Sequence, residues 1–184
     1  MEDLLDLIQE CKAHNPLAQK KLYQKFSSKL MGICLRYTNC KNDAEDLLQE
    51  VFIKIFTKME AYKGEGSFEG WIRRITVTTA IDFFHKKEKK PDHTNLEKAD
   101  IEYTDSNNAA REIEAKELLN LIQTLPDGYR MVLNLYCIEG YSHKEISEVL
   151  NISEGTSKSQ LSRARTLLAQ MISIKTDNIY EGKK

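Results

Sequence analysis

Several features of secreted and membrane proteins are missing from this sequence of 184 residues. The N-terminus, MEDLLDLIQE, is acidic and lacks the basic and apolar regions of a signal peptide. No apolar run reaches the length of a transmembrane helix. These absences predict a cytoplasmic protein without membrane insertion.

Cysteine and histidine show no spacing typical of a metal site, because the sequence contains no CxxC pair. The residues concerned are Cys11, Cys34, Cys40, Cys137, His14, His85, His93 and His143. In a reducing cytosol the thiols should stay free, and Cys34 and Cys137 are expected in the core. No convergent acid/base cluster is present either. We therefore expect no metal, no cofactor and no catalytic centre.

An excess of charge of one sign is also absent, since the formal net charge is −1. Any affinity for nucleic acid must come from local patches. The hydrophobic share of 41% supports packed cores, and the charged share of 30% is typical of a soluble, helix-rich protein. The length allows one domain or two small ones.

Strand signals are weak, whereas helical periodicity recurs along the chain. Helices are predicted over residues 3–12, 16–37, 42–60 and 68–87, with a loop at 63–67. Residues 92–117 contain eight acidic and three basic side chains, a net charge of −5, which favours a solvated linker. The sequence thus predicts an all-α fold of two small helical domains joined by a flexible acidic linker. The expected boundaries are 1–90, 91–117 for the linker, 118–174, and a tail at 175–184.

Residues 141–172 predict a helix-turn-helix, the most specific feature of the chain. Ser142 and Glu145 have the spacing of a capping box that begins a helix. The pattern breaks at 151–152, and Ser153 can cap a second helix. That helix is expected to bury Leu161, Ala164, Leu168 and Met171. Its outer face would offer hydrogen-bond donors to phosphates or base edges through Thr156, Lys158, Ser159, Gln160, Ser162, Arg163 and Arg165.

The predicted helix 42–60 carries a second candidate surface opposite its apolar stripe. Asp46, Gln49 and Glu50 share that face, and an acidic face is usually a solvated one. Ile53, however, adds a large aliphatic side chain beside them. This combination favours a protein partner with a basic surface.

Residues 71–90 carry a third candidate surface with a net charge of +4. Its cations could follow a phosphate backbone while Trp71, Phe83 or Phe84 stacks on unpaired bases. The alternative is that these aromatic side chains belong to the core and that the lysines end the helix favourably for its dipole. The sequence leaves both readings open for Trp71, and it favours the core for at least one phenylalanine.

Three segments together resemble the bacterial sigma factors, specifically the small two-domain extracytoplasmic-function type. They are DAEDLLQEVFIKIF (43–56), FEGWIRRITVTTAIDFFHKKEKK (68–90) and LPDGYRMVLNLYCIEGYSHKEISEVLNISEGTSKSQLSRAR (125–165). The resemblance covers nearly the whole chain, with the segments in the order of the family. It implies an alternative sigma factor that directs core RNA polymerase to a restricted set of promoters.

The resemblance also implies a role for each surface. Asp46, Gln49 and Glu50, with Ile53 beside them, would bind the β′ clamp helices of polymerase. Contacts to the −10 element and its unpaired strand would come from Trp71, Arg73, Arg74, Thr78, Asp82, His85, Lys86 and Lys87. Contacts to the −35 element would come from Glu154, Thr156, Lys158, Ser159, Ser162, Arg163 and Arg165. The β flap of polymerase and an anti-sigma factor are further implied partners.

Two departures from the family pattern bear on these expectations. Thr78 stands where many members have asparagine, and a hydroxyl lacks the paired donor and acceptor of an amide. Ser157 replaces the usual valine, so a buried hydroxyl must find a partner. The main rival is an ordinary helix-turn-helix regulator whose first lobe senses a ligand or dimerises. Such a regulator would bind its DNA tightly without polymerase.

Overall fold

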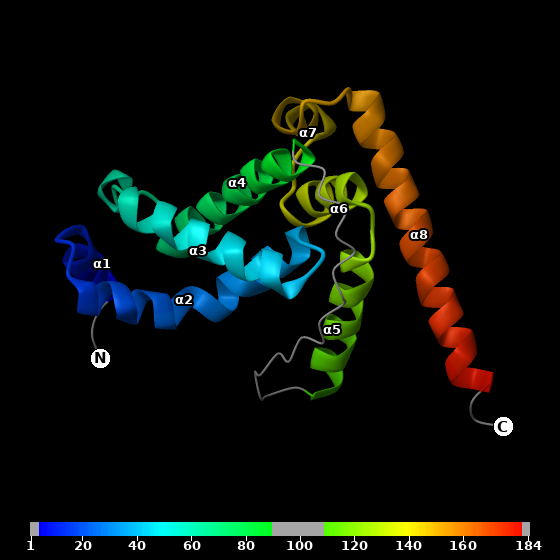
Figure 1. Cartoon of the computed structure of the whole chain (residues 1–184), viewed down its shortest axis with the longest axis horizontal. Helices are drawn as coiled ribbons and strands as arrows, with labels where there is room; N and C mark the ends of the chain where they lie inside the picture. The colour runs from blue at the N-terminus through cyan, green and yellow to red at the C-terminus, as the bar shows by residue number, and fades with distance from the viewer. Residues whose placement is uncertain (1–3, 90–108, 182–184) are drawn as a thin grey trace. The chain divides into compact units, whose positions relative to one another are not determined.

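A computed structural model describes residues 4–89 and 109–181 of the chain. Within these ranges the protein forms eight α-helices, two short helical turns and no strand, which confirms the all-α prediction. The described residues divide into two compact units (Figure 1): the first contains α1, α3, α4 and most of α2, and the second contains residues 36–40 with α5 to α8. Most of the acidic segment expected as a linker, 91–117, lies outside the described residues.

The first unit contains four helices and one 3-10 turn. Their bounds are α1 (Leu4–Lys12), α2 (Pro16–Tyr37), α3 (Lys41–Thr57), η1 (Met59–Ala61) and α4 (Phe68–Glu88). The Asn15 side chain caps α2, its Oδ1 accepting from the Leu17 amide at 2.9 Å. Ser67 caps α4 in the same way, accepting from the Gly70 amide at 3.1 Å. Local side chains therefore determine where both helices start.

Apolar stripes spaced three and four residues apart form the core of this unit. The buried side chains include Leu22, Phe26, Leu30, Leu47, Val51, Ile55, Ile72 and Ile75. α3 and α4 lie side by side (Figure 1). Tyr23 is 44% exposed at the edge of the core, where its ring lies 4.6 Å from that of Phe52. The core thus fixes α3 and α4 with one face of each turned outward.

The second unit is built around a long C-terminal helix. Its elements are α5 (Ala109–Gln123), α6 (Asp127–Leu133), the π-helical turn η2 (Asn134–Ile138), α7 (His143–Leu150) and α8 (Glu154–Glu181). α8 packs against α6 and α7. Helix α5 begins within the segment expected as linker, and α8 continues through most of the expected tail.

The helix-turn-helix forms as predicted. Ser142 and Glu145 make both bonds of the capping box, the Ser142 amide donating to Glu145 Oε2 at 2.8 Å and the Glu145 amide to Ser142 Oγ at 3.2 Å. Asn151 ends α7 with a left-handed backbone, φ +53°. The Thr156 amide donates to Ser153 Oγ at 3.0 Å, so Ser153 caps α8 as expected.

Candidate nucleic-acid and polymerase-binding surfaces

The predicted partner-binding residues of α3 share one outward face, called here the acidic face (Asp46, Gln49, Glu50 and Ile53). Their spacing places them on adjacent turns of the same side. Asp46 and Gln49 are exposed, Glu50 is half-buried, and Ile53 is 63% exposed. The acidic face thus combines carboxylate and amide groups with a large exposed aliphatic side chain.

Glu50 also contacts α4, which the sequence did not reveal. Lys86 Nζ donates to Glu50 Oε1 at 2.7 Å, and Lys54 Nζ lies 3.7 Å from the same oxygen. This hydrogen bond to Glu50, and the charge of that carboxylate, raise the pKa of Lys86 above its ordinary value. A candidate polymerase-binding residue thus holds a candidate DNA-binding residue.

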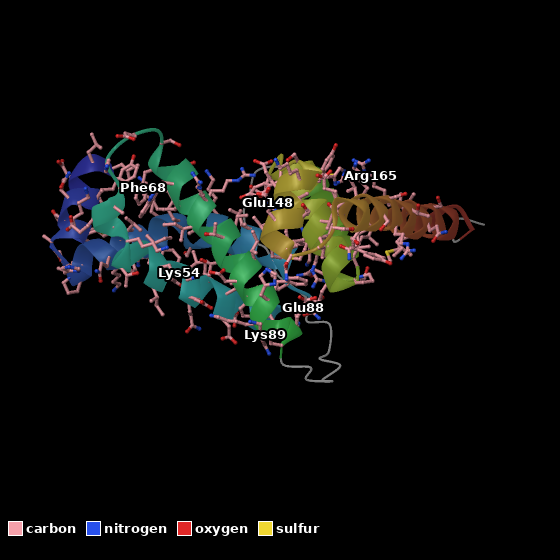
Figure 2. All side chains as sticks on the ribbon, turned by 90° about the horizontal axis from the view of Figure 1, so that it is seen from above. Lys54, Phe68, Glu88, Lys89, Glu148 and Arg165 are labelled. Atoms are coloured by element: carbon pink, nitrogen blue, oxygen red, sulfur yellow. The ribbon has the colours of Figure 1, made fainter. Side chains whose placement is uncertain are left out.

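Two further ion pairs connect the same two helices. Lys54 Nζ lies 2.8 Å from Asp82 Oδ2, and Lys87 Nζ lies 2.9 Å from Asp43 Oδ2. Together with the Glu50 contact they form what we call the α3–α4 ion-pair ladder. Figure 2 shows Lys54 on α3, and Phe68 and Glu88 near the two ends of α4. The ladder thus pairs three residues of α4 with side chains of α3. These three, Asp82, Lys86 and Lys87, are ones that the sequence predicted as DNA contacts.

The candidate −10 residues form two groups along α4. Trp71 to Thr78 lie in its first half and Asp82 to Lys87 in its second, and the full span is about 24 Å at 1.5 Å per residue. Arg73 and Arg74 are exposed, whereas His85 is half-buried with Nδ1 3.9 Å from Glu88 Oε2. The two groups could therefore contact different stretches of one strand.

The environment of Trp71 is intermediate between the two that the sequence left open, a core position and an exposed stacking surface. It is half-buried, with its ring 5.3 Å from the Tyr62 ring and 5.6 Å from the Phe68 ring. One part of the indole thus packs in an aromatic cluster while another part remains accessible. Phe83 and Phe84 are likewise half-buried, and neither belongs to the fully buried core.

Thr78 is exposed, but its hydroxyl is already engaged. Its Oγ1 donates to the backbone carbonyls of Arg74 at 2.9 Å and Ile75 at 3.0 Å. A base could use this hydroxyl as an acceptor without breaking those bonds. Thr78 therefore presents an acceptor and a methyl group to solvent.

Most of the candidate −35 residues are exposed on α8, as predicted. Glu154, Lys158, Ser159, Ser162, Arg163 and Arg165 are exposed, and Thr156 is half-buried. Lys158 lies 3.8 Å from Glu154, one turn earlier. Arg163 Nη1 donates to the Tyr129 hydroxyl at 3.4 Å, and the Arg165 guanidinium lies 5.8 Å from the centre of the Tyr136 ring. Tyrosines from α6 and η2 thus contact both arginines.

The side of α8 that was expected to be buried is fully buried only over its first part. Leu161 and Ala164 are buried, but Leu168 and Met171 are only half-buried, because α8 extends beyond the short helices that cover its start. Gln160 was wrongly assigned to the outer face. The Gln160 side chain is half-buried and lies against Gly128 of α6. A Cβ built on Gly128 would lie 3.1 Å from Gln160 Nε2.

One cysteine prediction was also wrong. Cys34 is buried as expected, but Cys137 is exposed, since the turn η2 directs it away from the core. Arg165 Nη2 lies 3.6 Å from its sulfur. Burial, and secondarily the charge of Glu10, raise the pKa of the Cys11 thiol.

Two other kinds of site are absent from the part of the chain that the structure describes. No group of three or more His, Cys, Asp or Glu side chains is arranged to hold a metal ion in residues 4–89 and 109–181. None of the helices described is both long enough and apolar enough to cross a bilayer.

Models of known families match both units. The model of sigma-70 region 2 matches residues 22–90, and that of sigma-70 region 4 matches residues 115–168. The first match contains α3 and α4, and the second contains the helix-turn-helix. Together they cover more than half of the chain.

Curated relatives match along 80 to 97% of their own length. An "ECF RNA polymerase sigma-E factor" of Haemophilus influenzae is 27% identical, with 93% of this chain and 97% of the relative covered. The factor of the same description from Escherichia coli is 28% identical, with 89% and 92% covered. An "RNA polymerase sigma-H factor" of Pseudomonas aeruginosa is 29% identical, with 78% and 80% covered.

A solved structure shares the fold. It is the sigma factor RpoE of Bartonella quintana, crystallised with the anti-sigma factor NepR, with a TM-score of 0.56 and 18% identity. The match covers 84% of this chain and 96% of that one. With both sigma-70 regions matched in order, the chain belongs to the sigma-70 family and is an alternative sigma factor of the extracytoplasmic-function type, a non-enzymatic factor that directs transcription initiation at promoters.

Proposed function

We propose that the acidic face of α3 binds core RNA polymerase through its β′ clamp helices. Asp46, Gln49 and Glu50 would pair with basic side chains of the clamp, and Ile53 would supply an apolar contact. The observation that carries this proposal is that Asp46, Gln49, Glu50 and Ile53 share one outward face, on which Ile53 is 63% exposed. Such a mixed face offers a basic partner both charged contacts and an apolar one.

The second part of the proposal assigns the −10 element to α4. Arg73 and Arg74 are exposed and suited to the phosphate backbone, and Trp71 has an accessible indole near them. Stacking on that indole would hold an unpaired base. Lys86 and Lys87 would add phosphate contacts, together with His85, at the other end of the helix.

The third part assigns the −35 element to α8. Its exposed start would enter the major groove, as the second helix of a helix-turn-helix does. Lys158, Arg163 and Arg165 provide cations, while Ser159 and Ser162 provide hydroxyls. Around this helix, the second unit would also contact the β flap of polymerase.

Two further assignments follow from the same family. The protein would act in the cytoplasm, where polymerase and promoter DNA are found. An anti-sigma factor would hold it inactive; the Bartonella sigma factor was crystallised in complex with one.

Run-off transcription with bacterial core polymerase on a library of genomic promoters tests the polymerase-binding assignment. Ile53→Asp is compared with Leu17→Asp, a matched control that changes a 70% exposed residue of α2. Wild type and the Leu17 variant should produce discrete new start sites. The Ile53 variant should lose most of them and bind core polymerase about tenfold or more weakly, since a buried apolar contact is replaced by a charge.

Two results would contradict the proposal. If Ile53→Asp and Leu17→Asp support equal transcription, the acidic face is not the polymerase contact. If the protein alone binds specific duplex DNA tightly and core polymerase adds nothing, the protein acts as an ordinary regulator and the polymerase assignment fails.

A further inference from the structure

A polar contact lies at the junction of the two helices of the helix-turn-helix. Ser157 of α8 is fully buried, 0% exposed, and its Oγ lies 2.9 Å from Nδ1 of His143, the first residue of α7. A buried hydroxyl needs such a partner. The bond is directional, so it favours one rotation of α8 about its axis, which an apolar contact would not specify.

The same imidazole is held on its face by an aromatic ring. The Tyr136 ring of η2 stacks on His143 with 4.5 Å between ring centres and 22° between planes. Tyr136 also contacts Arg165, whose guanidinium carbon lies 5.8 Å from the ring centre and whose Nη2 lies 3.6 Å from the Cys137 sulfur. Arg165 is exposed on α8 (Figure 2).

Four side chains thus form one connected set, called here the His143 bracket (Ser157, His143, Tyr136 and Arg165). Both ends of the bracket belong to α8, one buried and one exposed, eight residues apart. The two middle members come from α7 and η2. The bracket therefore connects the packing of α8 to the direction of a cation on its outer face.

We propose that His143 and Tyr136 are positioning residues for promoter recognition, holding α8 at one rotation and aiming the Arg165 guanidinium at the −35 DNA. This proposal rests on the assignment of the −35 element to α8. An arginine side chain has many rotamers, and stacking against a fixed tyrosine restricts them before DNA arrives. Neither His143 nor Tyr136 need touch DNA to have this effect.

The test uses the complete protein bound to core polymerase. Its binding to a promoter duplex is compared with binding to the same duplex carrying a scrambled −35 element, and the melting temperature is measured alongside. His143→Phe keeps the stacking ring but loses the bond to Ser157. His143→Asn keeps a polar group near the Nδ1 position but loses the ring. Tyr136→Leu removes the stack on both sides.

Each variant should lower the preference for the intact −35 element about five- to tenfold, the range of one well-placed side chain contact to DNA. In an Arg165→Ala background, Tyr136→Leu should have little further effect. Ile146→Val, which trims a fully buried side chain of α7 outside the bracket, is the control for lost stability. It should lower the melting temperature and leave the preference unchanged.

The experiment distinguishes two failures: that of positioning by the His143 bracket, and that of the assignment of α8 to the −35 element. If the wild-type complex does not distinguish the scrambled element, the assignment of α8 fails and the bracket has no promoter role. If wild type distinguishes it and the bracket variants do so equally well, positioning by His143 and Tyr136 is refuted alone. Positioning of Arg165 by Tyr136 is refuted in the same way if the effect of Tyr136→Leu is undiminished when Arg165 is alanine. Should His143→Phe fail to fold, Tyr136→Leu decides the question by itself.

Discussion

At the scale of single residues, burial separates the four cysteines into two kinds. Cys11, Cys34 and Cys40 are buried, whereas Cys137 is exposed. Thiol reactivity follows access and thiolate character, and burial raises the pKa of Cys11 further from neutrality. The native protein should therefore present one readily accessible thiol.

Labelling with a maleimide under native conditions should modify Cys137 first, giving one adduct per chain by mass spectrometry. All four thiols should react after unfolding in denaturant. Cys137→Ser is the matched control and should remove the fast adduct. Rapid labelling of two or more cysteines in the folded protein would contradict the burial of the other three.

Two sequence predictions failed at this scale for the same reason. Gln160 and Cys137 were each assigned from the periodicity of their own segment. Their surroundings depend on other elements, on Gly128 of α6 for the first and on the turn η2 for the second. Periodicity gives a face of a helix, and the neighbour determines whether that face is covered.

At the scale of elements, the capping box of α7 makes a pH-dependent contribution to stability. The Ser142 amide, and then its hydroxyl, donate to the Glu145 carboxylate and lower its pKa below the ordinary value. A lowered pKa in the folded state means that the stabilisation is present above about pH 4.3, the pKa of glutamate in an unfolded chain. It is lost as the pH falls through the lower folded value.

Glu145→Gln should therefore be less stable than wild type at neutral pH, and the difference should shrink as the solution is acidified below about pH 4. Urea unfolding followed by circular dichroism at several pH values measures it. Glu148→Gln, on the exposed side of the same helix, is the control. A constant difference across that pH range would show that the charge of Glu145 plays no part.

The α3–α4 ion-pair ladder is the second feature of the elements that contributes to stability. Its pairs are partly exposed, and such pairs contribute little in water and less in salt. For Asp43 and Lys87 we expect a coupling of about 0.2–1 kcal/mol from a double-mutant cycle with Asp43→Asn and Lys87→Gln.

This coupling should nearly vanish at about 1 M salt, where the screening length is about 3 Å. Unfolding of the four proteins in urea at low and high salt gives both values. A salt-independent coupling would mean that the two side chains interact through packing and not through charge.

At the scale of the whole molecule, two separate cores account for two functions in one chain. The first core presents the acidic face and α4, and the second presents α8. Each is near the lower size limit for an independent core. Since each unit contains its own set of buried apolar side chains, we expect each to fold alone.

Fragments 1–90 and 109–184 provide the test. Each should be helical by circular dichroism and unfold cooperatively. A fragment that remains unfolded would show that its core is incomplete without the other part of the chain, and that the expected domain boundaries are wrong.

The sequence by itself determined the helices and the surfaces they carry. Caps such as Asn15, Ser142 and Ser153 act on amides within three residues, so their effect can be read locally. The apolar stripes of α2, α3 and α4 predicted the core, because a helix repeats at a constant angle. The family followed from three segments in order.

Only the tertiary structure decided which side chains meet across elements. Glu50 with Lys86, and His143 with Ser157, are 36 and 14 residues apart along the chain, and no local pattern pairs them. The tertiary structure also provides the hydrogen-bond partner of the buried Ser157 hydroxyl, and it leaves the Trp71 side chain half-buried. Such contacts depend on how helices pack, which is the sum of many weak and non-local interactions, whereas caps and periodicity depend on one stretch of backbone.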